Sequence, residues 1–128
     1  MTTVFDEARF RELPIVGILR FFPREQVRHL IPAVLAGGLR NIEITMNTAG
    51  AEDLIRLARD LMDGQGNVGA GTVLTLGQLD SALAAGASFI VTPAVVPEVI
   101  RACVERGVPV MPGALTPTEI FTDRKSVV

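Results

Sequence analysis

The sequence has little cysteine, no long apolar run and no cluster of basic residues, and each scarcity excludes a class of protein. The single cysteine, Cys103, cannot form an internal disulfide and fits the reducing environment of the cytoplasm. No segment approaches the roughly 18 apolar residues of a membrane-spanning helix, and the acidic stretch 1–14 does not resemble a signal peptide. We therefore expect a cytoplasmic protein without a membrane partner.

Charge and composition narrow the class further. The net charge is −2 and the arginines are scattered, which argues against a surface that binds nucleic acid. With 128 residues, of which 48% are hydrophobic, the chain can bury the core of one domain but not of two. No group of histidine, cysteine and acidic residues has the spacing of a metal site, and His29 stands alone in a helical pattern. We expect no metal ion.

Short apolar runs alternate with longer segments of helical period along the chain. The runs predict strands at 14–20, 41–46, 67–73, 88–93 and 108–113. The segments between them predict helices at 23–38, 51–62, 76–86 and 97–107. An amphipathic turn at 5–13 precedes all of these and is expected to cover one end of the sheet. Repeated alternation of strand and helix predicts a parallel sheet of α/β class.

Capping residues mark several helix ends. Thr75 with Gln78, and Thr116 with Glu119, have the spacing of a capping box at the start of a helix. Glycines stand where three of the helices should stop, at Gly38, Gly86 and Gly107. Pro32 lies inside the first long helix, where it is expected to cause a kink.

Two architectures fit this alternation, an open sheet covered on both faces or part of a (β/α)8 barrel. A complete barrel needs at least about 200 residues, so this chain cannot be one by itself. The segment NIEITMNT favours the barrel, because Glu43, Thr45 and Asn47 would share one polar face of a strand. Strands covered on both faces are instead apolar throughout. The sequence therefore predicts a partial (β/α)8 TIM barrel of about five parallel βα units.

Polar residues gather at the predicted carboxyl ends of the strands, where ligands bind in parallel α/β folds. They comprise one cation, one carboxylate, an amide and several hydroxyls, together with glycine and proline: Arg20, Glu43, Thr45, Asn47, Gly71, Thr72, Thr92, Pro93, Pro112 and Gly113. This set suits a small, anionic, oxygen-rich substrate. The clustered aspartates of a phospho-acceptor domain and the G-x-G-x-x-G of a dinucleotide fold are absent.

Five ordered motifs resemble one known family. PIVGILR, GGLRNIEITMNT, VGAGTVLT, FIVTPAV and PVMPGALTPTEI run from about residue 13 to 122 and are similar to the 2-keto-3-deoxy-6-phosphogluconate / 4-hydroxy-2-oxoglutarate aldolases. The resemblance implies a class I aldolase on a (β/α)8 barrel, usually trimeric and without cofactors. It implies cleavage of a 2-keto-3-deoxy acid to pyruvate and an aldehyde through a lysine Schiff base.

The resemblance also implies roles for particular residues. Glu43 falls on the family's catalytic glutamate, which moves protons between the substrate hydroxyl, water and the Schiff-base carbons. A buried carboxylate with a raised pKa can act as acid and base in turn. Thr72, beside Gly71, falls on the threonine that binds the pyruvyl carboxylate. Thr92 and Pro93 match the wall of the pyruvate pocket.

Other positions leave alternatives open. Many members have an arginine at the position of Asn47, whereas an asparagine there resembles the phosphogalactonate branch. Arg20 could supply the missing cation, and Thr45 belongs to the same substrate-facing set. From the residues alone, Glu43 could be a structural carboxylate paired with Arg20 or Arg40. Thr72 could likewise be an ordinary hydroxyl at a strand end.

The amine that the resemblance requires has no clear match. Lys125 is the only lysine, and it stands in the polar tail DRKSVV, too early for the family's Schiff-base strand and without a dry pocket. We expect residues 1–122 to form the N-terminal part of the barrel and 123–128 a divergent tail without a phosphate site. The chain is then either an aldolase whose missing part is supplied elsewhere, or a non-catalytic remnant that binds keto acids weakly or forms homo-oligomers.

Overall fold

Strands and helices alternate in the computed structural model, which describes the backbone of residues 3–126 and the side chains of 3–123. The elements in chain order are α1 (Glu7–Glu12), β1 (Gly17–Leu19), α2 (Arg24–Ala36), β2 (Asn41–Thr45), α3 (Ala51–Met62), β3 (Asn67–Gly71), α4 (Leu76–Ala85), β4 (Ile90–Thr92), α5 (Pro97–Glu105), β5 (Val110–Pro112) and α6 (Pro117–Ser126). Each predicted strand is present, and each is shorter than its apolar run. The predicted boundary at residue 122 falls inside α6.

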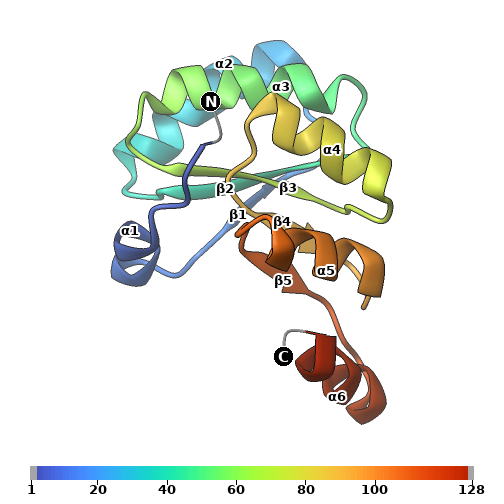
Figure 1. Ribbon diagram of the computed structural model, residues 1–128. Coiled ribbons are helices and arrows are strands. Elements are labelled where there is room, and N and C mark those ends of the chain that lie inside the picture. The colour runs from blue at the N-terminus through green and yellow to red at the C-terminus, as the bar shows by residue number, and fades with distance from the viewer. Residues whose placement is uncertain (1–2, 127–128) are drawn as a thin grey trace.

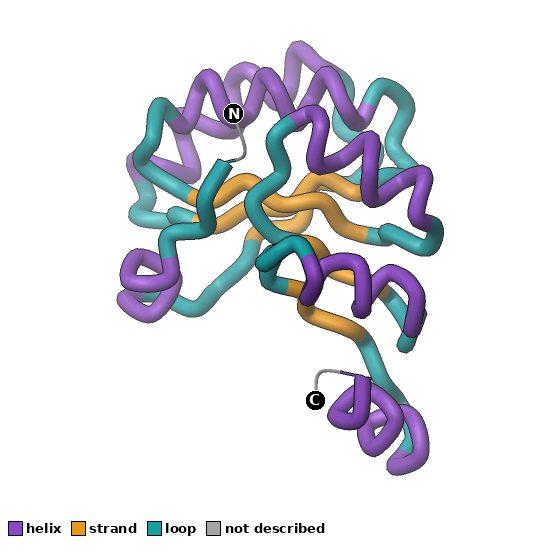
Figure 2. Tube along the Cα trace, in the orientation of Figure 1, coloured by secondary structure: helices purple, strands orange, loops and turns teal. Residues whose placement is uncertain are grey.

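The strands form one parallel sheet in the order β1-β2-β3-β4-β5. Each crossover therefore moves one strand further in the same direction, whereas a doubly wound sheet reverses direction at a switch point. Helices α2, α3 and α4 lie together over one face of the sheet, and α1 lies on the other side (Figure 1). The tube view shows the strands on the inside of this arc of helices (Figure 2). The strand order and the one-sided helix layer confirm the barrel-type prediction.

The hydrophobic core lies between the sheet and the helices. Strand residues that face the helices are fully buried, as at Ile42, Ile44, Ala70 and Ile90. They pack against the apolar stripes of the helices, which include Val27, Ile31, Leu54, Ile55, Ala58, Leu79 and Val99. Because side chains alternate along a strand, the other residues of each strand face the inside of the barrel arc. We call this second surface the inner face.

The predicted helix ends are present with their capping contacts. The Gln78 backbone N–H donates to the Thr75 hydroxyl oxygen at 3.1 Å, and the Glu119 N–H donates to the Thr116 hydroxyl at 3.2 Å. The Glu119 carboxylate completes that second box by accepting from the Thr116 N–H at 2.8 Å. Glycines with left-handed backbone follow α2, α4 and α5 at Gly38, Gly86 and Gly107. Helix α2 runs through Pro32 without a break.

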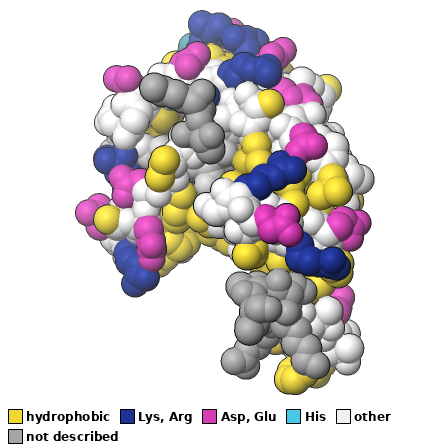
Figure 3. Space-filling model, in the orientation of Figure 1, with side chains coloured by type: hydrophobic (Ala, Val, Ile, Leu, Met, Phe, Trp, Pro, Cys, Tyr) yellow, Lys and Arg dark blue, Asp and Glu magenta, His cyan; other side chains and the backbone are white. Residues whose placement is uncertain are grey.

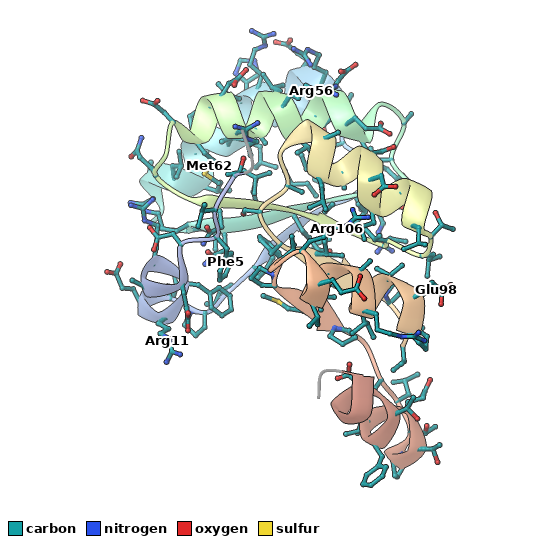
Figure 4. The ribbon with its side chains drawn as sticks, viewed as in Figure 1. Phe5, Arg11, Arg56, Met62, Glu98 and Arg106 are labelled. Atoms are coloured by element: carbon teal, nitrogen blue, oxygen red, sulfur yellow. The ribbon has the colours of Figure 1, made fainter. Side chains whose placement is uncertain are left out.

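The N-terminal segment closes one end of the inner face, as its amphipathic pattern predicts. The Phe5 ring packs edge-on against Phe89 with 5.7 Å between ring centroids, and Phe10 packs on Phe5 at 5.6 Å. Figure 4 shows Phe5 between α1 and the strands. The Asp6 backbone N–H donates to the Asn67 side-chain oxygen at 2.8 Å, and the Asn67 amide returns a bond to the Asp6 carbonyl at 3.0 Å. This segment is thus fixed to the amino end of β3.

Exposed apolar side chains lie on the inner face of β1 and just beyond the end of that strand. Ile18 on β1 is 59% exposed and Phe21 just after it is 66% exposed. In the space-filling view, hydrophobic side chains gather in the hollow beneath the sheet (Figure 3). Strands β1 and β5 are the edges of the described sheet, and neither shows the charged residues that usually guard an edge.

These edges predict that the isolated chain associates with itself. Unpaired strand edges and an open apolar face favour pairing with other chains. We expect light scattering at micromolar concentration to show dimers or larger species, or poor solubility, instead of a 13.7 kDa monomer.

A charged residue on the edge strand provides the control. Ile18→Lys should shift the chain toward monomer, because a lysine on an edge opposes strand pairing. Val104→Lys, at an exposed position on α5, should leave the association unchanged. A monodisperse wild-type monomer would contradict the prediction.

Candidate active site

Glu43 is a buried carboxylate on the inner face at the middle of β2. It is 4% exposed, between the helix-facing residues Ile42 and Ile44. Its carboxylate lies over Gly71 on β3, where a Cβ atom would come within 2.7 Å of the Glu43 carboxyl carbon. Any side chain at position 71 would therefore displace the carboxylate. The glycine in the motif VGAGTV provides the space that this acid occupies.

The electrostatic setting of Glu43 suits a group that transfers protons. Burial raises the pKa of the Glu43 carboxyl above its ordinary value, and the nearby Arg20 guanidinium partly offsets this effect. No ion pair engages Glu43 within the described residues. Arg40 instead donates to the Leu35 carbonyl at 2.6 Å. The alternative of a structural ion pair between Glu43 and Arg20 or Arg40 is therefore not what the structure contains.

Arg20 and Thr72 lie close together at the carboxyl ends of β1 and β3. We call this end of the barrel arc, where the strands end, the mouth. The Arg20 guanidinium donates to the Thr72 hydroxyl at 3.3 Å, and Arg20 itself is exposed. Thr72 has a positive φ of 56°, and Phe21, next to Arg20, has a φ of 60°. Backbone of this kind is strained in residues other than glycine and is enriched at functional sites. A cation and a hydroxyl are thus presented together at the carboxyl ends of two strands.

Thr45 continues the polar face of β2, but its hydroxyl is already engaged. Thr45 is fully buried, and its hydroxyl lies 3.0 Å from that of Thr48. The Thr48 hydroxyl also accepts from the Phe21 backbone N–H at 3.0 Å, which ties the end of β1 to the turn after β2. Sequence reasoning missed Thr48. Its place in a turn just before α3 was the available indication, because hydroxyl side chains favour such turns.

Two predicted site residues lie elsewhere than expected. β2 ends at Thr45, so Asn47 belongs to the following turn, where it is exposed, and does not share the strand face of Glu43. Thr92 lies on the helix-facing side of β4, with Ile90, and its buried hydroxyl donates to the Ala94 carbonyl at 2.7 Å. The Thr92 hydroxyl thus holds the turn after β4. The part of Thr92 in a pocket wall stays a prediction.

Pro93 directly follows β4 and is exposed. The Gly113 backbone N–H donates to the Thr92 carbonyl at 2.7 Å, which brings the ends of β4 and β5 together. A Cβ at Gly113 would lie 2.7 Å from the Pro93 carbonyl oxygen, so the two strand ends are in close contact. Gly71 and Thr72 at the end of β3 lie on the neighbouring strand. The mouth is thus built from successive strand ends.

Other ionisable and reactive residues lie outside this mouth. His29 is exposed on α2, 3.0 Å from the Glu25 carboxylate. Cys103 is buried in α5, where burial raises the pKa of its thiol to about 11. Within residues 3–126 no group of three or more histidine, cysteine or acidic residues is placed to hold a metal ion. No helix in the same range has the length and apolarity to cross a membrane.

Comparison with known proteins places this arrangement among aldolases. Residues 6–125 match the family described as "KDPG and KHG aldolase". The chain is 38% identical over 122 residues to the 2-dehydro-3-deoxy-phosphogluconate aldolase of Treponema pallidum, covering 94% of this chain and 56% of the relative. It is 39% identical over 112 residues to the 2-dehydro-3-deoxy-6-phosphogalactonate aldolase of Escherichia coli, covering 87% and 54%. The chain thus spans about half the length of the curated relatives it matches.

Solved structures agree with the sequence match. The structure named "Native KDPGal structure" aligns with a TM-score of 0.84 at 36% identity, covering 90% of this chain and 56% of that one. A KDPG aldolase from Legionella pneumophila, with pyruvate captured as a covalent carbinolamine intermediate, aligns with a TM-score of 0.84 at 28% identity, covering 94% and 58%. The family match covers nearly the whole chain, and the sheet order and inner-face carboxylate accord with it. The chain belongs to the KDPG and KHG aldolase family.

Proposed function

We propose that the chain carries the proton-transfer part of a class I aldolase site. The reaction would cleave a 2-keto-3-deoxy-6-phospho sugar acid, or 4-hydroxy-2-oxoglutarate, to pyruvate and an aldehyde. The observation that supports this most directly is Glu43, a buried carboxylate seated over Gly71 on the inner face with no ion pair among the described residues. A carboxylate in that setting is suited to exchange protons with a substrate.

The chemistry requires one group to act first as a base and then as an acid. After the C2 carbonyl of the keto acid has condensed with an amine and lost water, a base takes the proton of the C4 hydroxyl. The C3–C4 electrons then pass through C2 to the nitrogen, and the aldehyde leaves. The same group, now protonated, returns its proton to C3, and water releases pyruvate. We assign both transfers to Glu43.

The substrate's carboxylate would bind at the mouth beside Glu43. Arg20 and the Thr72 hydroxyl are already 3.3 Å apart there and together offer a positive charge and a hydrogen-bond donor. The Gly71 backbone and Pro93 would line the same pocket, and the exposed Asn47 would contact the sugar-acid chain at its rim. Thr45 would act indirectly, by holding the turn that carries Asn47 through its bond with Thr48.

We also propose that the working protein is a cytoplasmic homo-oligomer, a trimer if it follows the family resemblance. The exposed apolar residues Ile18 and Phe21 support association. One structural neighbour, which aligns with a TM-score of 0.81 at 35% identity over 87% of this chain and 41% of that one, is a cage "designed by fusing symmetric oligomeric domains". The single buried cysteine suits a reducing compartment.

A second candidate function is non-catalytic. Lys125 is the only lysine in the sequence, and its side chain lies outside the described residues. If no amine reaches the site beside Glu43, the chain could still bind pyruvate-like acids weakly through Arg20 and Thr72, or serve as an oligomerising remnant. This candidate and the aldolase differ in one respect only, the supply of the amine.

A hybrid enzyme separates the two candidates. Residues 1–122 would replace the matching part of the Escherichia coli phosphogalactonate aldolase, which supplies the rest of its own chain. We expect the hybrid to release pyruvate from 2-dehydro-3-deoxy-6-phosphogalactonate at a rate comparable with the host enzyme, measured with a coupled assay. A hybrid that folds, as judged by circular dichroism and a cooperative thermal transition, but releases no pyruvate would favour the non-catalytic function.

A further inference from the structure

Two glycines on β3 leave two successive inner-face positions of that strand without side chains. Gly69 and Gly71 both point inward, and the residue between them, Ala70, is buried on the helix-facing side. A Cβ at Gly69 would lie 2.5 Å from atoms of the Phe89 ring. A Cβ at Gly71 would overlap the Glu43 carboxylate. The Phe89 ring, just before β4, and the Glu43 carboxylate from β2 therefore lie over these two glycine positions.

The register of the sheet places Phe89 in the same row as Glu43. Glu43 pairs with Gly69, and the pairing of Ala70 with Ile90 puts Gly69 beside Phe89. The two occupied positions on β3 are separated by about 7 Å, two residues of a parallel strand. No side chain of β3 stands between the ring and the carboxylate, so the ring forms the apolar side of the space that holds the acid.

The Phe89 ring is held in place by the N-terminal segment. It is fully buried, and Phe5 packs against it on the side of α1 with 5.7 Å between centroids. The segment that carries Phe5 is fixed by the two hydrogen bonds between Asp6 and Asn67. Asn67 also donates to the Asn41 side-chain oxygen at 2.8 Å, which joins the amino ends of β2 and β3. The ring therefore has little freedom to move away from the acid.

We propose that Phe89 is a positioning residue for Glu43. Its ring, lying over Gly69, excludes water from the amino-terminal side of the carboxylate and keeps it seated over Gly71. The catalytic consequence rests on the proposed aldolase function, but the packing itself does not. Phe89 touches no substrate in this proposal and acts only through the acid.

Few charged groups lie near Glu43. The effect of the Phe89 ring on the Glu43 carboxylate can therefore be measured separately from the effect of charge. Arg20, just after β1, is the charged group that acts on the Glu43 carboxylate. Phe89 and the inner-face residues of β3, β4 and β5 are not ionisable: Asn67, Gly69, Gly71, Val91 and Met111. On the side of α1, Asp6 and Arg9 form an ion pair at 3.6 Å. A change at Phe89 therefore alters the hydration of Glu43 without altering a charge next to it.

The test measures the Glu43 titration in the 128-residue chain by carbon NMR of the side-chain carboxyl groups, with Glu43→Gln to assign the signal. In Phe89→Leu, we expect the pKa of Glu43 to fall toward the ordinary value of 4.5, because water gains access to the carboxylate. Phe89→Met, whose longer unbranched side chain reaches further across the site of the ring, should show a smaller fall and serves as the second variant if Phe89→Leu does not fold. Ile90→Val is the matched control, since Ile90 is the next residue of β4 and equally buried on the opposite face.

The outcomes distinguish positioning from general stability. Both Phe89→Leu and Ile90→Val should lower the melting temperature, but only the change at Phe89 should move the Glu43 titration. In the active hybrid, the acid limb of the rate profile should move to lower pH by the same amount, because cleavage needs Glu43 ionised. An unchanged Glu43 titration in Phe89→Leu or Phe89→Met, or an equal shift in Ile90→Val, would overturn the proposal. An inactive hybrid would overturn the aldolase function while leaving the NMR test intact.

Discussion

Glu43→Gln in the hybrid aldolase is expected to cut turnover by about 100-fold or more, the usual scale for removing a general acid–base group. The amide keeps the shape of the side chain over Gly71 but can neither take the proton of the C4 hydroxyl nor return one to C3. Condensation of pyruvate with the lysine should survive in part, because the amine comes from the host portion. The measurements are steady-state pyruvate release and trapping of the pyruvate adduct with borohydride.

The control lies one residue away on the same strand. Ile44→Val removes a methylene from the helix-facing side of β2, where Ile44 is fully buried, and should cost only about 0.5–1.5 kcal/mol of stability. Its turnover should stay close to that of the unmodified hybrid. If Glu43→Gln instead retained turnover within a few-fold, Glu43 would be a structural carboxylate, and the polar face of β2 would need another explanation.

The strands and helices could be predicted because the apolar pattern of each one lies within its own short segment of sequence. α3 matches its predicted range of 51–62, where an apolar stripe of strict helical period sets both ends. The strands are shorter than their apolar runs, most clearly at β4, where 88–93 was predicted and Ile90–Thr92 is observed. The outer residues of such runs can be buried without pairing in a strand, as Ser88 and Phe89 are just before β4. Composition alone does not distinguish this burial from strand pairing.

The site residues could be predicted only within a strand, where side chains alternate between the two faces of the sheet. Glu43 and Thr45 lie on one face as expected, but the chain turns after Thr45 and Asn47 leaves that face. The position of Thr92 was likewise not predictable, since its parity along β4 puts it with Ile90 on the helix side. Both placements depend on where strand pairing stops, which the sequence does not show.

The contact between Phe89 and Gly69 of β3 could not be foreseen at all. It depends on the register between β3 and β4, which only the folded sheet defines. The sequence shows a phenylalanine in one apolar run and two glycines in another, and neither run indicates its partner. The strained backbone at Thr72 and Phe21 is equally invisible in the sequence, because positive φ at such residues follows from tertiary contacts such as the Phe21–Thr48 bond.

The 128-residue chain by itself is expected to show no retro-aldol activity above the rate of free amines. A Schiff-base amine must be unprotonated at neutral pH, which requires a dry pocket or a neighbouring cation to depress its pKa. The only lysine, Lys125, is part of the polar segment TDRKSVV, two residues beyond the described side chains. Incubation with pyruvate and borohydride, followed by mass spectrometry, should therefore find no stoichiometric adduct.

The hybrid enzyme and the variant Lys125→Arg are the two controls for this experiment. The hybrid, which carries the host's lysine, should trap one pyruvate per chain under the same conditions, so a negative result with the 128-residue chain cannot come from failed chemistry. Lys125→Arg in the 128-residue chain should change nothing. A single efficient adduct on Lys125, lost in Lys125→Arg, would contradict the prediction and place the amine within reach of Glu43. In that case the chain would hold both groups that the reaction needs, and its competence would no longer depend on a second segment of polypeptide.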